Sequence, residues 1–372
     1  MNEPGTTPSL QAAAVYRARV RGCLLGGALG DALGYPVEFA SLDRIRAAHG
    51  PRGVTGLVPG AYGAVGLISD DTQMTLFTVE ALIQARAQVR EKGTGSAWPL
   101  LLRRAYERWL QTQSRPGPEQ PEPPQPGAPT GPQASAPSQG GLVTEAWLYS
   151  RRAPGNACLS GVAQMYAPDA TLPLDGTPGE VNPDSKGCGT VMRSAPFGLV
   201  NPADAAFAMA ARGAQITHGH PTGYYAAGAL AAIVAHLVAG DSLEGAVLRA
   251  LRLLERHRGH DETTAALRAA LDLAADGTPT AEKVESLGAG WVAEEALAIG
   301  VYCALAEPRP EQALLLAVNH SGDSDSTGSI CGNLLGALHG DTGLPHDWVA
   351  RVEGRATIAA LADDVAAQYA RG

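Results

Sequence analysis

The feature that most constrains the fold is a regular spacing of glycine in two apolar segments near opposite ends of the chain. Residues 22–34 read GCLLGGALGDALG, and Gly328, Gly332 and Gly336 recur four residues apart within 325–340. This spacing places the glycines on one face of a helix. Each glycine costs about 1 kcal/mol relative to alanine in a helix, so close helix–helix contact or close approach to a ligand must offset it. Asn333 favours a tightly packed soluble helix over a membrane-spanning one.

Helical periodicity also dominates the rest of the chain. Apolar residues recur three and four positions apart, whereas no segment shows the clear period-two alternation of a half-buried strand. We therefore predict an all-α fold, a compact orthogonal helical bundle that forms a single domain over residues 1–372. The segments expected to be helical are 15–34, 74–82, 102–110, 230–238, 248–254, 267–274, 290–306, 310–318 and 325–340.

Composition and charge limit the classes of function. Of the 372 residues 45% are hydrophobic, which allows a large buried core, and the formal net charge is −9. A negative chain argues against the phosphate backbone of nucleic acid as the main partner. No signal peptide is evident, and no stretch reaches the ~18 uninterrupted apolar residues of a membrane span. We expect a cytoplasmic monomer with no membrane partner, and read its five cysteines as reduced thiols without a zinc or iron–sulfur site.

One segment, 114–141, departs from the helical pattern. It consists almost entirely of Pro, Gly, Gln, Ser and Ala. Such a composition cannot bury enough apolar surface to offset the entropy of ordering it. We predict a disordered insert between two helices rather than a boundary between two domains, and a partner-binding tract is the alternative.

Two short acidic runs carry the candidate chemistry. The first is Ser69-Asp70-Asp71-Thr72, and the second, 323–327, reads DSDST. Their carboxylates and hydroxyls are hard oxygen ligands that suit Mg²⁺ or Mn²⁺. Adjacent carboxylates repel one another unless a cation or a proton compensates them. One run alone is equally typical of a helix N-cap, but the two together favour a shared site for two divalent ions about 3.5–4 Å apart.

Four separated patches make the chain resemble the ADP-ribosylglycohydrolase family. They are GCLLGGALGDALGYPVE at 22–38, SDDTQM at 69–74, GCGTVMR at 187–193 and SGDSDSTGSICG at 321–332, with a weaker fifth patch at 217–224. The patches occur in the family's order and span most of the chain. The run RAPG at 152–155 also resembles the bacterial branch of the family, although we assign it no role.

The resemblance implies an all-α fold with a binuclear Mg²⁺ centre in a central cleft, with Mn²⁺ as an alternative ion. It implies that Glu38 and Asp325 are catalytic, because Glu38 or a metal-bound aspartate would assist proton movement while water attacks the anomeric carbon of ADP-ribose. Asp31 is expected to support the site from outside. The implied metal ligands are Ser69, Asp70, Asp71, Asp323, Asp325 and Ser326.

The patch at 187–193 resembles a loop that cradles the diphosphate and ribose. Glycines there let backbone N–H groups approach anionic oxygen closely, and a plain glycine turn is the alternative. Relatives often carry Asn where Cys188 stands, which bears on recognition of the ribose or the acceptor. The implied substrate-binding residues are Ser185, Lys186, Gly187, Cys188, Gly189, Thr190 and His218.

The function implied is hydrolysis of the N- or O-glycosidic bond between ADP-ribose and an acceptor, commonly an arginine side chain of a protein. The partner is then an ADP-ribosylated protein or a small ADP-ribose conjugate. Two alternatives stay open: a Mg²⁺-dependent hydrolase of another ADP-ribose conjugate or nucleotide, and a non-catalytic ADP-ribose-binding relative. The five tryptophans, Trp291 among them, are expected to be core or surface anchors rather than platforms for adenine.

Overall fold

The computed structural model describes residues 10–60, 63–93, 97–119 and 141–369, and within these ranges the protein is built from helices. The described residues contain no strand, only two isolated β-bridges. The all-α prediction is therefore confirmed. In the first half lie α1 Leu10–Gly34, α2 Leu42–His49, α3 Asp70–Lys92, α4 Trp98–Ser114, α5 Asn156–Ala163, α6 Ala195–Val200, α7 Ala203–Ala214 and α8 Pro221–Ala239.

The second half continues with helices that pack around the same centre. These are α9 Leu243–Leu254, α10 Asp261–Ala274, α11 Ala281–Glu285, α12 Ala293–Ala306, α13 Pro310–Val318, α14 Ser324–His339, α15 His346–Val349 and α16 Arg355–Tyr369. Short 3₁₀ turns are η1 Tyr35–Val37, η3 Leu142–Thr144, η4 Ala146–Leu148, η5 Cys188–Thr190 and η6 Asp341–Gly343.

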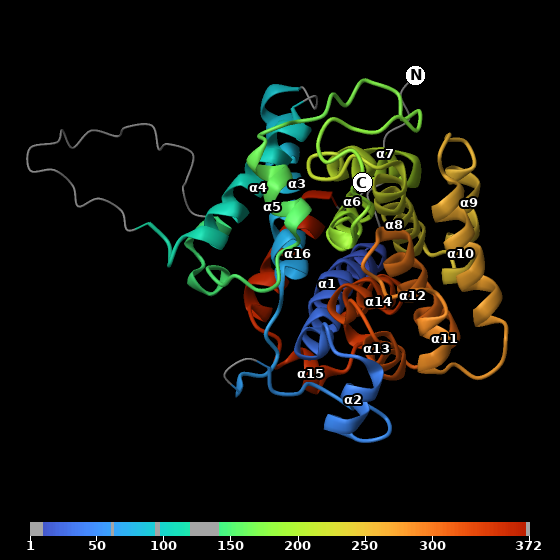
Figure 1. Ribbon diagram of the computed structural model, residues 1–372. Helices are drawn as coiled ribbons and strands as arrows, with labels where there is room; N and C mark the ends of the chain where they lie inside the picture. The colour runs from blue at the N-terminus through green and yellow to red at the C-terminus, as the bar shows by residue number, and fades with distance from the viewer. Residues whose placement is uncertain (1–9, 61–62, 94–96, 120–140, 370–372) are drawn as a thin grey trace, which may run out of the picture.

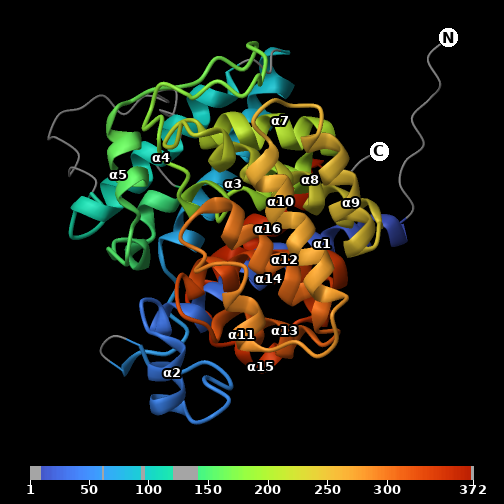
Figure 2. The ribbon, with the colours of Figure 1, turned by 45° about the vertical axis from the view of Figure 1, so that its right-hand side comes forward.

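The two glycine-rich helices, α1 and α14, lie side by side at the centre of the bundle (Figures 1 and 2) and form its most extensive helix pair. Their backbones touch, and this explains the glycine spacing. A Cβ atom built on Gly30 would lie 1.9 Å from the carbonyl oxygen of Gly328, and one built on Gly26 would lie 2.2 Å from that of Gly332. The contact brings the C-terminal end of α1 against Ser324, the first residue of α14.

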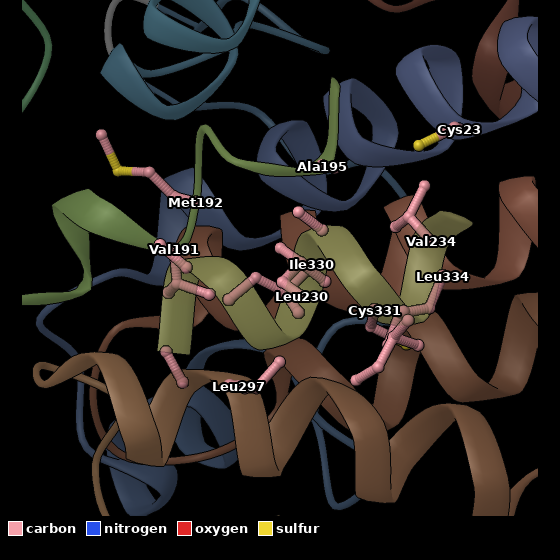
Figure 3. Close-up of a cluster of buried hydrophobic side chains, with 14 of the residues drawn as sticks. Cys23, Val191, Met192, Ala195, Leu230, Val234, Leu297, Ile330, Cys331 and Leu334 are labelled. Carbon is pink, nitrogen blue, oxygen red and sulfur yellow. The ribbon is translucent and has the colours of Figure 1, made fainter. Parts of the chain in front are cut away.

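Small and aliphatic side chains fill the core around this pair. Leu230 of α8, Leu297 of α12 and Ile330 of α14 belong to one cluster of buried hydrophobic residues (Figure 3). By length and hydropathy alone α8 could cross a membrane, but 83% of its apolar window is buried inside the protein. It is therefore typical of a buried core helix.

Some predicted boundaries shift, each for a local reason. The helix expected over 290–306 begins at Ala293, because Gly290 has a positive φ of 82° and Val292 forms a β-bridge with Gly187. The start of the predicted insert, Ser114, is the last residue of α4, while 120–140 lies outside the described residues. The single-domain organisation and the disorder of the insert stay predictions.

Candidate active site

The first acidic run begins α3, and α1 holds it in place. The Ser69 hydroxyl accepts a hydrogen bond from the Asp71 N–H at 3.2 Å, which makes Ser69 the N-cap. The buried carboxylate of Asp31 accepts hydrogen bonds from the backbone N–H groups of Ser69 (2.9 Å) and Thr72 (3.1 Å). Asp31 thus stabilises the helix start that presents Asp70 and Asp71, in line with the supporting role expected for it.

The second acidic run begins α14 in a similar way. Asp323 is the N-cap residue and Asp325 lies in the first turn, and both are buried. The Asp323 N–H donates to the carbonyl oxygen of Ala289 at 2.9 Å. The thiol of Cys188 donates to Asp323 Oδ2 at 2.7 Å. Cys188 is therefore an orienting contact of a candidate metal ligand, a relation that the sequence pattern does not reveal.

Glu38 approaches the second acidic run from the end of α1. Pro36 lies in the 3₁₀ turn that follows the helix, as expected from a residue that breaks helices, and the Glu38 N–H donates to Gly34 O at 2.9 Å. Glu38, Asp323 and Asp325 can each offer a carboxylate oxygen, and these atoms lie within 4.8 Å of one another. Residues almost 290 positions apart thus converge.

These side chains line a cavity of about 350 Å³. The predicted residues on its wall are Glu38, Asp70, Asp71, Gly187, Cys188, Gly189, His218, Asp323, Asp325 and Ser326. Four predicted residues are not on that wall. Ser69 and Thr190 are buried behind it, Ser185 lines an adjoining depression, and Lys186 pairs with Glu262 and Glu294. The roles predicted for the residues on the wall and for these four all stay predictions.

The electrostatics of the cavity are strongly unfavourable for bare carboxylates. Burial, followed by the negative charges of Asp325 and Asp323, raises the pKa of Glu38 to about 11. Burial and the charge of Asp325 likewise raise the pKa of Asp70 and of Asp71 well above the usual range. Residues of both acidic runs line the cavity, so their charges act on one another there.

The donor set fits hard divalent cations. Oε2 of Glu38 and Oδ2 of Asp71 are buried without a hydrogen-bond partner among the described residues. The residues that line the cavity include no Lys or Arg, so no fixed positive charge of the wall offsets the carboxylates. Oxygen ligands of this type suit Mg²⁺ or Mn²⁺, and Asp70, Asp71, Asp323 and Asp325 are the residues that would hold the ions.

The glycines of the 187–190 loop pack closely against neighbouring side chains. A Cβ atom on Gly189 would lie 2.5 Å from the sulfur of Cys158, and one on Gly187 would lie 3.2 Å from His218 Nε2. The N–H of Cys188 already donates to the carbonyl oxygen of Trp291 at 3.1 Å. Among the hydrogen bonds of the described residues, those of this loop do not use the N–H groups of Gly187 and Gly189. These two groups are therefore available to an anionic oxygen.

A buried hydrogen-bond relay sets the state of His218. Arg193, 1% exposed, donates to Thr217 Oγ1 at 2.6 Å, and that hydroxyl lies 2.7 Å from His218 Nδ1. The guanidinium only donates, and the threonine hydroxyl also lies 3.3 Å from the carbonyl oxygen of Ala214, so this hydroxyl can serve either tautomer of the ring. Burial, with a smaller effect of Arg193, lowers the pKa of His218 to about 3. His218 is thus a neutral ring whose Nε2 lies beside Gly187.

The residue pattern missed part of the wall. The segment 153–158 lines the cavity and includes the end of the RAPG run, for which the sequence analysis assigns no role. Phe39 and Trp291 also line it. Trp291 is 40% exposed, and the anchor role expected for it stays a prediction. The position of Phe39 directly after Glu38 is the one sequence feature that could have placed the Phe39 ring at the site.

Comparison with known proteins shows which family this chain is similar to. A sequence model of the ADP-ribosylglycohydrolase family matches residues 12–372. The chain is 25% identical over 342 residues to the ADP-ribosyl-dinitrogen reductase glycohydrolase of Rhodospirillum rubrum, with 90% of each chain covered. It is 27% identical over 350 residues to an uncharacterized protein of Archaeoglobus fulgidus, covering 92% of this chain and 94% of that one.

A solved structure shares the fold. It is described as an ADP-ribosylglycohydrolase-related protein complex, and it superposes with a TM-score of 0.64 at 23% identity. The match covers 96% of this chain and 99% of the other.

Proposed function

This chain belongs to the ADP-ribosylglycohydrolase family and is a glycosidic-bond hydrolase acting on ADP-ribose conjugates, and from this premise we propose that its substrate is ADP-ribosyl-arginine on a protein and that the reaction depends on Mg²⁺. The observation that carries the metal dependence is the cluster of Glu38, Asp323 and Asp325, whose ligand atoms lie within 4.8 Å. The orphaned oxygens of Glu38 and Asp71 support it.

A protein substrate is supported by the Rhodospirillum rubrum relative, whose name specifies ADP-ribosyl-dinitrogen reductase. Room for the ADP portion is available beside the carboxylates. The cavity shares Asn156 and Ala157 with an adjoining depression of about 830 Å³, which Ser185 also lines. An extended ligand can therefore run from the carboxylates toward Ser185, passing the loop at 187–190 and His218.

The chain's own residues divide the chemistry between them. The N–H groups of Gly187 and Gly189 donate to anionic oxygen of the ligand, and His218 joins them in the tautomer that carries its proton on Nε2. Glu38 Oε2, buried and unpartnered, is the atom that exchanges a proton with the attacking water or the leaving acceptor. Bound divalent cations would offset the repulsion between the aspartates and polarise oxygen atoms of the sugar and of water.

Two other functions compete with this proposal. Another ADP-ribose conjugate or a nucleotide could be the substrate of the same carboxylates. A non-catalytic binding protein would not need the buried acidic cluster, whose repulsion costs stability when no cation compensates it. The cluster therefore favours an enzyme over a binding protein.

The test is a panel of defined ADP-ribosyl conjugates, linked through arginine, serine, a nucleobase or a small molecule, assayed with Mg²⁺ and with a chelator. We expect release of free ADP-ribose from the arginine conjugate only with Mg²⁺. Asp323→Ala should abolish it, whereas Asp261→Ala, an exposed acid in the first turn of α10, should not. Preference for another conjugate would refute the acceptor, and full activity in the chelator would refute the metal dependence.

A further inference from the structure

Two exposed aromatic rings stand at the mouth of the carboxylate cavity. Phe39 is 67% exposed and Trp291 is 40% exposed, and both line the cavity. Their rings stack with centroids 5.1 Å apart and planes 21° from parallel. They come from segments about 250 positions apart, so the fold brings them together. Large exposed aromatic groups that gather beside a polar cavity are typical of a binding surface.

The backbone at Phe39 argues that this ring is retained for a purpose other than packing. Its φ is +65°, a left-handed conformation that glycine adopts freely and that costs other residues of order 1–2 kcal/mol. An exposed phenyl ring recovers little of that cost by burial. Such outliers cluster at ligand sites, and this one directly follows Glu38.

The backbone around Trp291 is fixed by the walls of the site itself. Its carbonyl oxygen accepts the hydrogen bond from Cys188, and Ala293 N–H donates to Lys186 O at 2.8 Å. The preceding residue, Gly290, packs so closely on Asp323 that an added Cβ would lie 3.3 Å from the Asp323 Cβ. The indole is therefore held beside both the glycine loop and a candidate metal ligand.

The two ends of the cavity differ in chemistry. The end that continues into the depression near Ser185 does not include Phe39 or Trp291. The aromatic end instead adjoins Glu38 and Asp323, and within the described parts of the chain no Lys or Arg lines it. Aromatic faces carry negative electrostatic potential and attract planar cations, guanidinium above all. Carboxylates nearby add to that attraction.

We propose that Phe39 and Trp291 form an acceptor subsite that selects the leaving group by planarity, stacking a planar cation against the exposed rings while ADP-ribose occupies the other end. This inference rests on the proposed function, since it assigns the acceptor side of that reaction. The pair is a specificity-determining contact, and it moves no proton.

The test separates affinity for the acceptor from turnover. Calorimetry of the protein loaded with Mg²⁺ and ADP-ribose measures binding of agmatine, which carries a guanidinium, and of cadaverine, a flexible diamine of the same charge without a planar group. Phe39→Leu keeps an apolar side chain and removes the ring. We expect it to weaken agmatine binding about 3- to 30-fold, the range of a cation–π contact, and to leave cadaverine binding unchanged.

Turnover gives a second readout. Phe39→Leu should raise KM for the arginine-linked conjugate by a similar factor, with kcat and the affinity for free ADP-ribose preserved. The matched control is Met165→Leu, because Met165 is 61% exposed, has φ +55° and does not line the cavity. Trp291→Leu provides an independent variant of the same subsite.

The outcomes are distinct. Equal affinity of wild type and Phe39→Leu for agmatine, or equal weakening of agmatine and cadaverine, overturns the subsite. A wild-type enzyme that hydrolyses only non-planar conjugates overturns it as well. A wild-type protein that releases ADP-ribose from no conjugate refutes the proposed function instead, and the agmatine titration still decides whether the rings bind a planar cation.

Discussion

Replacing Gly34 by alanine tests whether the packing of α1 against α14 sets the position of the candidate active site. Gly34 is the last residue of α1, and its φ of −81° is compatible with alanine. An added Cβ would lie 2.1 Å from Ser324 O and 2.5 Å from Asp325 N. Both atoms belong to the backbone that presents Asp325, so no side chain can rotate away to relieve the overlap.

The size of the effect follows from that overlap. Real Cβ contacts under 3.0 Å essentially never occur, so the start of α14 must move by about 1 Å relative to α1. Overpacking of this kind costs about 1–3 kcal/mol, and for a chain of 372 residues each kcal/mol lowers Tm by about 1.3 °C. A displacement of about 1 Å at a catalytic group can cost on the order of 10²-fold in rate.

The assay pairs thermal unfolding with kcat/KM on the preferred conjugate. Gly22→Ala is the matched comparison, because its Cβ would lie 2.3 Å from Gly336 O at the other end of the same interface. It should lower Tm to a similar extent and leave kcat/KM near wild type. Gly117→Ala has no atom within 4 Å of the new Cβ and should change neither quantity.

Two results would refute the reasoning. A Tm for Gly34→Ala at or above that of wild type would mean that α1 and α14 can move apart to accept the added methyl group at no cost in stability. Equal losses of kcat/KM in Gly34→Ala and Gly22→Ala would mean that the interface affects activity only through general stability, not through the position of Asp325.

Four further predictions address the site and the insert. Mg²⁺ at about 100 times its Kd should stabilise the wild type by about 2.7 kcal/mol and Asp323→Ala much less; equal shifts in Tm would place the ions elsewhere. Glu38→Gln should cut turnover by about 10²–10⁴-fold and keep ADP-ribose affinity within roughly tenfold of wild type, and near-normal turnover would move proton transfer to a metal-bound aspartate. Replacement of residues 114–141 by a short Gly-Ser linker should preserve Tm and turnover, and a collapse in either would show that the segment docks on the core. The pKa of His218 is lowered to about 3, so the unfolded chain binds a proton there below about pH 6.5 while the folded protein does not; stability should fall between pH 6.5 and 3 more steeply in wild type than in His218→Gln, as measured by urea unfolding at each pH.

Much of the site was predictable because its chemistry is local in sequence. Asp70 and Asp71 directly follow the serine that caps their helix, and Asp323 and Asp325 occupy the same kind of helix start. Helix N-termini favour carboxylates, so each run predicts both the start of a helix and a candidate set of metal ligands. The glycine spacing likewise predicted close helix packing, since the cost of glycine in a helix must be recovered by contact.

The sequence by itself determined the helical fold, the two acidic helix starts and the position of Glu38 after a proline-broken helix end, because these depend on periodicity, capping and backbone restriction within a few residues. Only the tertiary structure decided which residues meet. It placed the Cys188 thiol on Asp323, linked Arg193 through Thr217 to His218, turned Lys186 toward Glu262 and Glu294, and stacked Phe39 on Trp291. Each of these contacts joins separate segments of the chain, and their geometry is set by the packing of α1 against α14 and of the loops around that pair, which no local pattern encodes.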